Sequence, residues 1–530
     1  MDTHIDSRLT KRKRQPIWIM IYIFMYIALF LILCLRSPID FGTSYLWGED
    51  GIVLYGDAAE LGIGTVFASS NGTYWVLQRL IGYIVYIVLY PFNALRLYPA
   101  VLSIITKLIE TFAFFYFTSD RFERIVKSRW ARFFIAISLI LAIPDNAVDL
   151  INCDTSSPFI LIFVVFLIGF NAFYNRDTLN VGEGIFLILM GFSSAAVPFI
   201  VGVAFLCLIL FIYYNKGRFK TKSFKVHLCK YIVACLGTTI SFIVQVSSIL
   251  SYGRTSGVEF DLFERLWNNC FFWAWMPYSN YYKGDIVRTA LLVGMALWIV
   301  LAVISKMKPI AVLYSIAFSV TFSLMCSMAF SVGEYYLPES AMTTVAGRFW
   351  SLPYQIAAFY LGVVIWRLWN RYAFRSVAIV LIAVELSILL PHYPIKELGT
   401  EQHYIDIFNN NVESLDKDGG ELLEVIIGPW DPFYMRVPID LDDESLSCIE
   451  DTEGVLDQHP KTTLCYSVTV PEDLSNPITG AYLSIDNRAR IIGMYNIDRN
   501  NDGTSTIEFR LMNLATFITP DTRFDVYIKH

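Results

Sequence analysis

The chain has 530 residues, of which 55% are hydrophobic and only 17% are charged, and its formal net charge is −6. Soluble domains carry about 25% charged residues, so this composition argues against a wholly soluble protein. Nucleic-acid binding is also disfavoured, because the chain has no basic excess that could neutralise phosphates along a groove. The sequence therefore predicts an α-helical polytopic membrane protein.

Charge divides the chain into two parts. From Pro391 onward there are 10 Lys and Arg residues against 25 Asp and Glu residues, so the last 140 residues carry a net charge of −15. The first 390 residues carry +9. We therefore predict a transmembrane domain over 1–390 and an acidic domain over 391–530.

A helix needs about 20 apolar residues to cross the hydrocarbon, and eleven apolar segments of the first domain are candidate membrane spans. They are 17–35, 98–118, 132–147, 157–174, 183–195, 197–214, 230–250, 287–304, 309–331, 349–368 and 374–390. The first is predicted to be a signal anchor, because no small-residue cleavage site follows Leu35. Segment 74–97 is ambiguous, because it is apolar but contains two arginines and a proline.

Loop charge favours the eleven-span arrangement. If segment 74–97 lies at the membrane interface, 22 basic residues fall on one side of the membrane and eight on the other. Basic loops are retained in the cytoplasm. The sequence therefore predicts a cytoplasmic amino terminus, an outward loop with interfacial helices over 36–97, and an outward carboxyl-terminal domain.

The carboxyl-terminal domain is predicted to be β-rich. Short runs rich in β-branched and aromatic residues lie between turn-forming residues, at 481–485, 491–497, 505–511 and 523–528. An amphipathic helix is expected over 401–415. Residues 498–503 resemble the start of a calcium loop, but position twelve would be Phe509, so a hairpin turn is the better interpretation. The six histidines are scattered, and the sequence predicts no metal site.

Carboxylates and aromatic rings gather in the predicted outward loops. Glu49 and Asp50 follow the first span and lie beside Trp47. Carboxylates near aromatic platforms suit a carbohydrate, whose edges carry hydroxyls and whose faces are apolar. The candidate acceptor or sugar ligands are Asp57, Asp145, Asp149, Trp47, Trp273 and Trp275. The competing interpretations are a solvated loop for the carboxylates and an interfacial belt for the aromatic residues.

This arrangement resembles the GT-C superfamily of membrane glycosyltransferases. The shared features are an inward basic tail, one span, an acidic pair in the first outward loop, an interfacial stretch, many further spans and an outward terminal domain. Arg348, in the segment Ala346–Phe349, resembles the basic residue that such enzymes place near a lipid phosphate. Further candidates for that phosphate are Arg79, Arg254, Lys283 and Arg288. Arg348 could instead be an interfacial anchor.

The resemblance implies a bacterial enzyme of the cytoplasmic membrane that moves one sugar from a polyprenyl-phosphate donor to a cell-envelope glycan. We expect inverting displacement, with Asp50 as the general base and Glu49 as the reserve candidate. No cofactor is required, and a divalent cation at the phosphate is left open. The alternatives are a polymerase, a ligase, or a transporter of lipid-linked sugars, to which buried charges such as Lys107 and Glu110 would point.

Two cysteines, Cys448 and Cys465, lie in the predicted outward domain, 17 positions apart. A disulfide closing such a loop would stabilise the domain by about 3 kcal/mol. The alternative is a pair of thiols that fill the core of a β-domain.

Overall fold

The computed structural model describes residues 3–36, 50–143 except 71, 154, 157–251 except 220, 300–329, 347–390, 421–426 and 434–530, the last range apart from 451, 453, 459–463, 474, 487, 489, 495, 501 and 512–520. The chain divides into two compact units. The helical unit consists of Met1–Phe41, Ser69–Leu77 and Ile104–Lys396. The mixed unit consists of Gly42–Ala68, Gln78–Ser103 and Glu397–His530.

The helical unit is built from apolar helices of 11 to 34 residues. They are α1 (Thr3–Arg36), α4 (Tyr98–Tyr116), α5 (Arg129–Leu141), α7 (Pro158–Ala172), α8 (Val181–Gly191), α9 (Val197–Tyr214), α10 (Lys222–Ser251), α13 (Pro309–Ala329), α15 (Gly347–Trp369) and α16 (Arg375–Leu389), with α4 beginning in the mixed unit. Described helices overlap all eleven predicted segments, and residues 300–304 are the described part of the eighth. Four helical stretches are long and apolar enough to cross a membrane, namely Trp18–Arg36, Leu95–Phe122, Val197–Tyr214 and Phe224–Ser251. The mostly helical body therefore agrees with a membrane protein.

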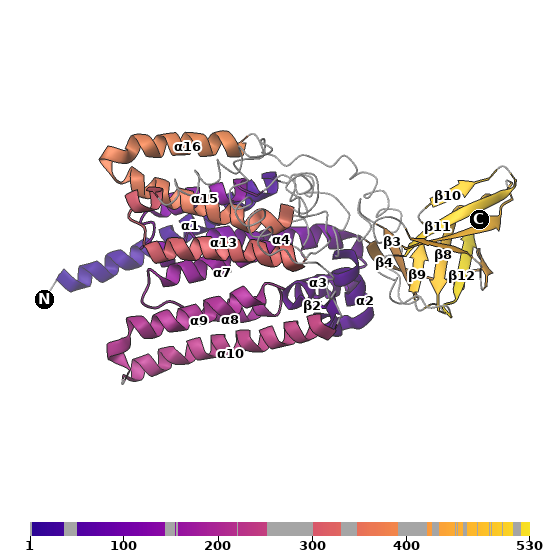
Figure 1. Cartoon of the computed structure of the whole chain (residues 1–530), viewed down its shortest axis with the longest axis horizontal. Helices are drawn as coiled ribbons and strands as arrows, with labels where there is room; N and C mark the ends of the chain where they lie inside the picture. The colour runs from indigo at the N-terminus through magenta and orange to yellow at the C-terminus, as the bar shows by residue number, and fades with distance from the viewer. Residues whose placement is uncertain are drawn as a thin grey trace. The chain divides into compact units, whose positions relative to one another are not determined.

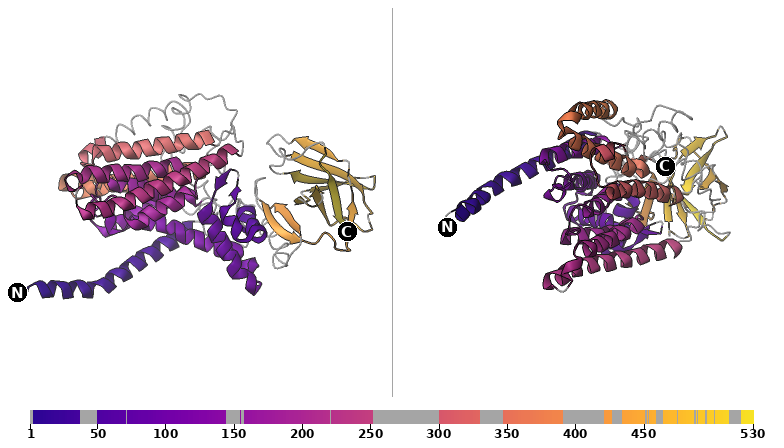
Figure 2. Two further views of the ribbon diagram at one scale, coloured as in Figure 1. Left: turned by 90° about the horizontal axis from the view of Figure 1, so that it is seen from below. Right: turned by 60° about the vertical axis from the view of Figure 1, so that its left-hand side comes forward.

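Helix α7 lies at the centre of this unit. It is apolar all round, as expected of a helix that packs on every side, and nearly all of its residues are buried. Helices α13 and α15 run beside it, and α8, α9 and α10 pack against one another in a neighbouring layer (Figures 1 and 2). Phe166 of α7 makes ring contacts with Tyr314, Phe318 and Phe359 of the two adjacent helices.

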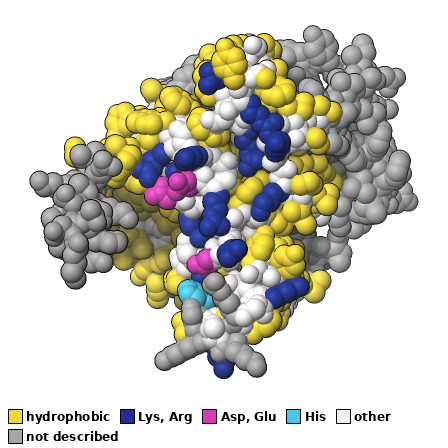
Figure 3. All heavy atoms as spheres, turned by 90° about the vertical axis from the view of Figure 1, so that its left-hand side faces the viewer, with side chains coloured by type: hydrophobic (Ala, Val, Ile, Leu, Met, Phe, Trp, Pro, Cys, Tyr) yellow, Lys and Arg dark blue, Asp and Glu magenta, His cyan; other side chains and the backbone are white. Residues whose placement is uncertain are grey.

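The basic loops that the sequence places on one side of the membrane meet at one end of this unit. We call this end the basic end and define it by residues 117–128, 173–181, 215–222, 305–309 and 367–375. Hydrogen bonds connect these loops, for example from Arg124 to Tyr174 O (3.2 Å) and from Lys308 Nζ to Phe173 O (2.6 Å). Lys and Arg side chains gather on this face, with few acidic side chains among them (Figure 3). The described parts of these loops therefore lie at the same end of the helical unit.

The mixed unit combines a segment from the first predicted loop with the carboxyl-terminal domain. Its helical part comprises η2 (Asp50–Gly56), α2 (Asp57–Leu61), η3 (Gly62–Phe67), α3 (Val76–Leu89), η4 (Tyr90–Phe92) and η5 (Leu95–Leu97), of which η2 is a π-helix. A hairpin of β1 (Ser69–Ser70) and β2 (Thr73–Tyr74) belongs to the helical unit. From residue 78 onward, helix α3 belongs to the same compact unit as η2 and α2.

The carboxyl-terminal domain is a β-sandwich. One sheet has the strand order β4-β3-β9-β8-β12-β5 and the other β10-β11-β7-β6, and among the strands that the structure describes there, only β3 and β9 pair in parallel. The strands are β3 (Glu421–Ile426), β4 (Tyr434–Ile439), β5 (Leu446–Ile449), β6 (Val455–Gln458), β7 (Leu464–Pro471), β8 (Gly480–Ile485), β9 (Arg490–Gly493), β10 (Asn496–Arg499), β11 (Thr504–Leu511) and β12 (Phe524–Lys529). Apolar residues of both sheets, such as Val468, Phe509 and Val526, share one core. Strand β4 also packs against η2.

The prediction that this domain is β-rich is confirmed, but one of the predicted strands is two strands in the structure. The run predicted over 491–497 forms two strands, β9 and β10, which belong to different sheets. The predicted turn at 498–503 connects β10 and β11, where Gly503 has a φ of 80° and Asp502 accepts a hydrogen bond from Thr504 N. The expected helix over 401–415 and the Pro-rich boundary near 391 lie outside the described residues.

The expected disulfide between Cys448 and Cys465 is wrong. Cys448 is an exposed residue of β5 in the six-stranded sheet, whereas Cys465 is buried on β7 in the four-stranded sheet, and the two are not bonded. Strand β5, with Cys448, pairs with β12, and strand β7, with Cys465, pairs with β11. The two thiols therefore belong to separate sheets.

Candidate functional site

Asp50 is buried at the first residue of η2. Only 2% of its surface is exposed, and all seven residues of η2 are buried. π-Helices are rare and short and occur frequently at functional sites. The sequence predicted a position in the first outward loop for this residue and left open whether it is solvated, so its burial is a finding of the structure. A carboxylate in this position is sheltered from bulk water.

Arg79 holds the segment that follows Asp50. Its Nη1 lies 2.8 Å from Asp57 Oδ2 and 2.8 Å from Thr65 Oγ1, and it also donates to Val53 O at 3.2 Å. The guanidinium is 1% exposed and contacts η2, α2 and η3 together. Arg79 and Asp57 were predicted as phosphate and sugar ligands, whereas these contacts join them in an ion pair that organises the loop.

Close packing of α3 against η2 depends on Gly82. A Cβ atom at this position would lie 2.8 Å from Leu54 Cβ and 2.9 Å from the Tyr98 hydroxyl, so any larger residue would push the two helices apart. Tyr55 of η2 contacts the rings of Tyr86 and Tyr98 edge to face. Asp50, Asp57 and Arg79 therefore stand in one closely packed arrangement, which we call the loop module and define as residues 50–68 and 78–103.

A second polar group lies inside the helical unit. Lys107 and Glu110 are fully buried on one face of α4, and Lys107 is the middle residue of that helix. Asp154, also fully buried, accepts a hydrogen bond from Thr106 at 3.2 Å. Ionisable residues buried at membrane depth are expensive and mark functional sites by default. We call Thr106, Lys107, Glu110 and Asp154 the buried charge cluster.

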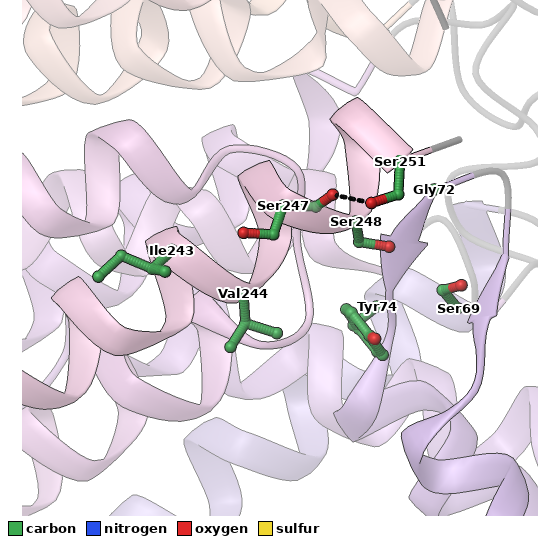
Figure 4. A pocket seen from close by; sticks show the side chains of 8 residues that line it. All are labelled: Ser69, Gly72, Tyr74, Ile243, Val244, Ser247, Ser248 and Ser251. Carbon is green, nitrogen blue, oxygen red and sulfur yellow. Dashed lines mark hydrogen bonds between the residues drawn. The ribbon is translucent and has the colours of Figure 1, made fainter. Parts of the chain in front are cut away.

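The helical unit also contains an open pocket of about 570 Å³ beside the carboxyl-terminal end of α10 (Figure 4). It is lined by Ser69, Gly72, Tyr74, Ile243, Val244, Ser247, Ser248 and Ser251. Gln245 fixes the hairpin that forms one wall, because its Nε2 donates to Tyr74 O and its Oε1 accepts from Tyr74 N, both at 2.9 Å. Four serine hydroxyls and one phenol suit a ligand that makes many hydrogen bonds.

The remaining predicted site residues are placed as follows. Arg348 is the second residue of α15. Nine others lie outside the described residues: Trp47, Glu49, Asp145, Asp149, Arg254, Trp273, Trp275, Lys283 and Arg288. Of the predicted set, the structure brings together Asp57 and Arg79, in the same module as Asp50.

Sequence reasoning missed the roles of several residues. Gln245 lies in an apolar run, and three serines follow it within six residues. This polar interruption of a predicted span is a usable signal for the pocket. Asp154 follows Asp145 and Asp149 in the loop between two predicted spans, and no feature of the sequence distinguishes it. Glu183 is the first residue of the predicted span 183–195, and it completes a capping box with Asn180 and pairs with Arg121 at 2.7 Å.

No protein-family model matches the chain, and no curated protein is significantly similar to it.

Proposed function

We propose that this protein is an integral-membrane glycosyltransferase that moves a single sugar from a polyprenyl-phosphate donor to a cell-surface glycan. The observation that carries the proposal is the buried Asp50 at the start of η2, held within the loop module by the Arg79–Asp57 pair. Such a carboxylate can act as a general base where bulk water does not compete for the acceptor. The resemblance of the architecture to the GT-C superfamily supports the same assignment.

In this mechanism Asp50 removes the proton from an acceptor hydroxyl as its oxygen attacks the anomeric carbon of the donor sugar. The bond between that carbon and the phosphate oxygen breaks, and the polyprenyl phosphate leaves with its electron pair. The configuration at the anomeric carbon is inverted. Proton removal by a placed base contributes about 10²–10⁴-fold to the rate.

Arg348 is the proposed partner of the leaving phosphate. It is the second residue of α15, and the first turn of a helix carries backbone N–H groups without intrahelical acceptors. Anions are favoured at such a helix start, and an arginine adds a planar donor pair that matches phosphate. Arg348→Ala should therefore abolish most turnover, and Arg348→Lys should retain part of it.

The proposed topology places the basic end in the cytoplasm and the β-sandwich outside. It rests on the excess of Lys and Arg at that end of the helical unit. The reaction would then occur on the outer face of the bacterial cytoplasmic membrane. The decisive experiment is a turnover assay of the purified full-length protein with defined polyprenyl-phosphate sugars and a glycan acceptor. Wild-type protein that transfers no sugar from any of them would contradict the proposal.

The buried charge cluster favours a second candidate, a transporter of lipid-linked sugars. Lys107, Glu110 and Asp154 are ionisable groups inside the helical unit, as expected of a translocation pathway. Reconstitution into vesicles separates the two functions. A transporter moves the lipid-linked sugar across the bilayer without an acceptor, and Lys107→Met should stop that movement. The glycosyltransferase requires the acceptor and leaves free polyprenyl phosphate.

A further inference from the structure

We propose that five cations at the basic end bind the phosphate of an anionic phospholipid headgroup. The cations are Lys306, Lys308, Arg367, Arg371 and Arg375, and we call them the cation cluster. They come from the turn that precedes α13 and from the end of α15 and the start of α16. This proposal does not depend on the glycosyltransferase assignment.

Hydrogen bonds hold the two turns together. Arg367 Nη1 donates to Lys306 O at 2.8 Å, and Arg371 donates to Ile304 O. Lys308 Nζ donates to Phe173 O and lies 5.0 Å from the centre of the Tyr174 ring. The cluster is therefore assembled in advance, and a ligand would not have to order the loops.

Three carboxylates at or beside the basic end pair with cations outside the cation cluster. Glu183 pairs with Arg121, Asp177 with Lys230, and Asp120 with Arg129 and Arg132. Among the residues that the structure describes, no member of the cation cluster has a carboxylate within ion-pair distance. One donor, Arg367 Nε, is buried without a hydrogen-bond partner in this part of the chain. The cluster thus keeps positive charge that an external anion can neutralise.

The surroundings favour a lipid over a free phosphate. Tyr372 is 86% exposed, and the Arg375 guanidinium lies 5.3 Å from its ring and 5.9 Å from that of Trp369. Exposed tryptophan and tyrosine are enriched at the boundary between membrane and water. Exposed apolar side chains begin within a turn of the cluster, at Val303, Ile310 and Leu313. Cations above such an apolar flank match a headgroup whose acyl chains lie along the helices.

Lys306 occupies a position that glycine normally takes. Its φ is 54°, and the bonds Lys306 N to Val303 O (3.0 Å) and Met307 N to Ala302 O (3.1 Å) form a Schellman helix end. In that motif the left-handed residue is usually glycine, because other residues are strained there. Lys306→Gly therefore removes one cation of the cluster while making the backbone easier to fold.

The test is a titration of the full-length protein in detergent with phosphatidylglycerol, followed by native mass spectrometry. Wild-type protein should bind it at least tenfold more tightly than phosphatidylcholine. Each cation near a membrane surface is worth about a fivefold change in affinity. Lys306→Gly should weaken binding about fivefold, and the triple variant Lys306→Gly, Lys308→Gln, Arg375→Gln about 100-fold.

A matched control removes two exposed lysines from another part of the same end, Lys216→Gln in the turn before α10 and Lys225→Gln in the first turn of α10. This variant should bind phosphatidylglycerol as wild type does. Equal weakening in the control would show diffuse charge rather than a site, and would overturn the proposal. Unchanged affinity in a folded triple variant would also overturn it. If free glycerol phosphate binds as tightly as phosphatidylglycerol, the ligand is a phosphate group without a lipid, and the proposal is wrong.

Discussion

Asp50 is where the proposed chemistry can be tested most directly at the scale of single residues. Asp50→Asn keeps the side-chain volume but removes the base, so turnover should fall by about 10²-fold or more while the protein still folds. Sugar release by the purified variant measures this. Glu49→Gln should be close to wild type. Wild-type turnover in both variants would exclude the acidic pair as the base.

Arg79 is expected to act on stability rather than on donor binding. Removing one partner of a buried ion pair leaves the other charge uncompensated and costs about 3–5 kcal/mol. Arg79→Ala should therefore lower the unfolding temperature and expose the loop module to protease, whereas Arg79→Lys should restore part of the stability. Thermal unfolding in detergent and limited proteolysis provide the two measurements. A stable Arg79→Ala variant with weakened donor affinity would contradict this expectation and support the prediction from the sequence that Arg79 binds the donor phosphate.

The β-sandwich contains a carboxylate that should make its stability depend on pH. A hydrogen bond from Ser505, together with the Arg499 guanidinium at 3.1 Å, lowers the pKa of Glu472 below its ordinary value. A group with a depressed folded-state pKa stabilises the fold above the unfolded pKa, which is about 4.3 for Glu, and this contribution is lost as pH falls below it. Hydrogen exchange of β7 and β11 amides, corrected for intrinsic rates, should rise below roughly pH 4.3 in wild type. Glu472→Gln should already exchange faster at pH 7 and show a weaker pH dependence.

Residue types and positions in the sequence were enough to select Asp50, Asp57 and Arg79, but not to assign their roles. A carboxylate next to an aromatic residue in a loop has the same local signature whether it is solvated or buried. The ion pair between Asp57 and Arg79 joins residues 22 positions apart, and only the fold of η2, α2 and α3 makes them neighbours. The disulfide prediction failed for the same reason, because spacing along the chain says nothing about which sheet a strand joins.

At the scale of elements, the packing of α3 on η2 can be tested through Gly82. Gly82→Ala forces a contact of 2.8 Å with Leu54, and overpacking of this kind typically costs about 1–3 kcal/mol. The variant should lose both stability and turnover, because it displaces the helix that begins with Asp50. Gly202→Ala in α9 is the matched control, since nothing lies within 4 Å of its added Cβ. The control should gain up to about 1 kcal/mol from helix propensity, and a loss of the same size in both variants would refute the packing argument.

Elements themselves were more predictable than sites. Apolar length alone located the helices, and local capping set their ends, as at Ser128, whose side chain accepts from Ala131 N at the start of α5. Strands β8, β11 and β12 followed from alternation between turn residues. Strands β3 to β7 were not predicted, and β9 and β10 were merged, because the crossing between sheets near Met494 has no distinctive residue pattern.

The orientation of the whole molecule in the membrane can be measured by labelling of single cysteines. Cys448 is exposed on β5, so an impermeant maleimide should label it in intact cells if the β-sandwich is outside. A cysteine introduced at Lys216, on the basic end, should react only after the membrane is permeabilised. Peptide mass spectrometry identifies the labelled position. Labelling of the Lys216→Cys variant from outside would reverse the proposed topology.

The composition of the mixed unit has a consequence for biosynthesis. Its loop module leaves the ribosome about 300 residues before the strands of the β-sandwich, although both belong to one compact unit and β4 packs against η2. At about 5–20 residues per second, translation alone imposes a delay of roughly 15–60 s. During that interval the segment containing Asp50 lacks strand β4, against which η2 packs in the folded protein. A nascent or truncated copy without these strands would lack the packing of β4 on η2, so synthesis of the β-sandwich sets the time at which the loop module can finish folding.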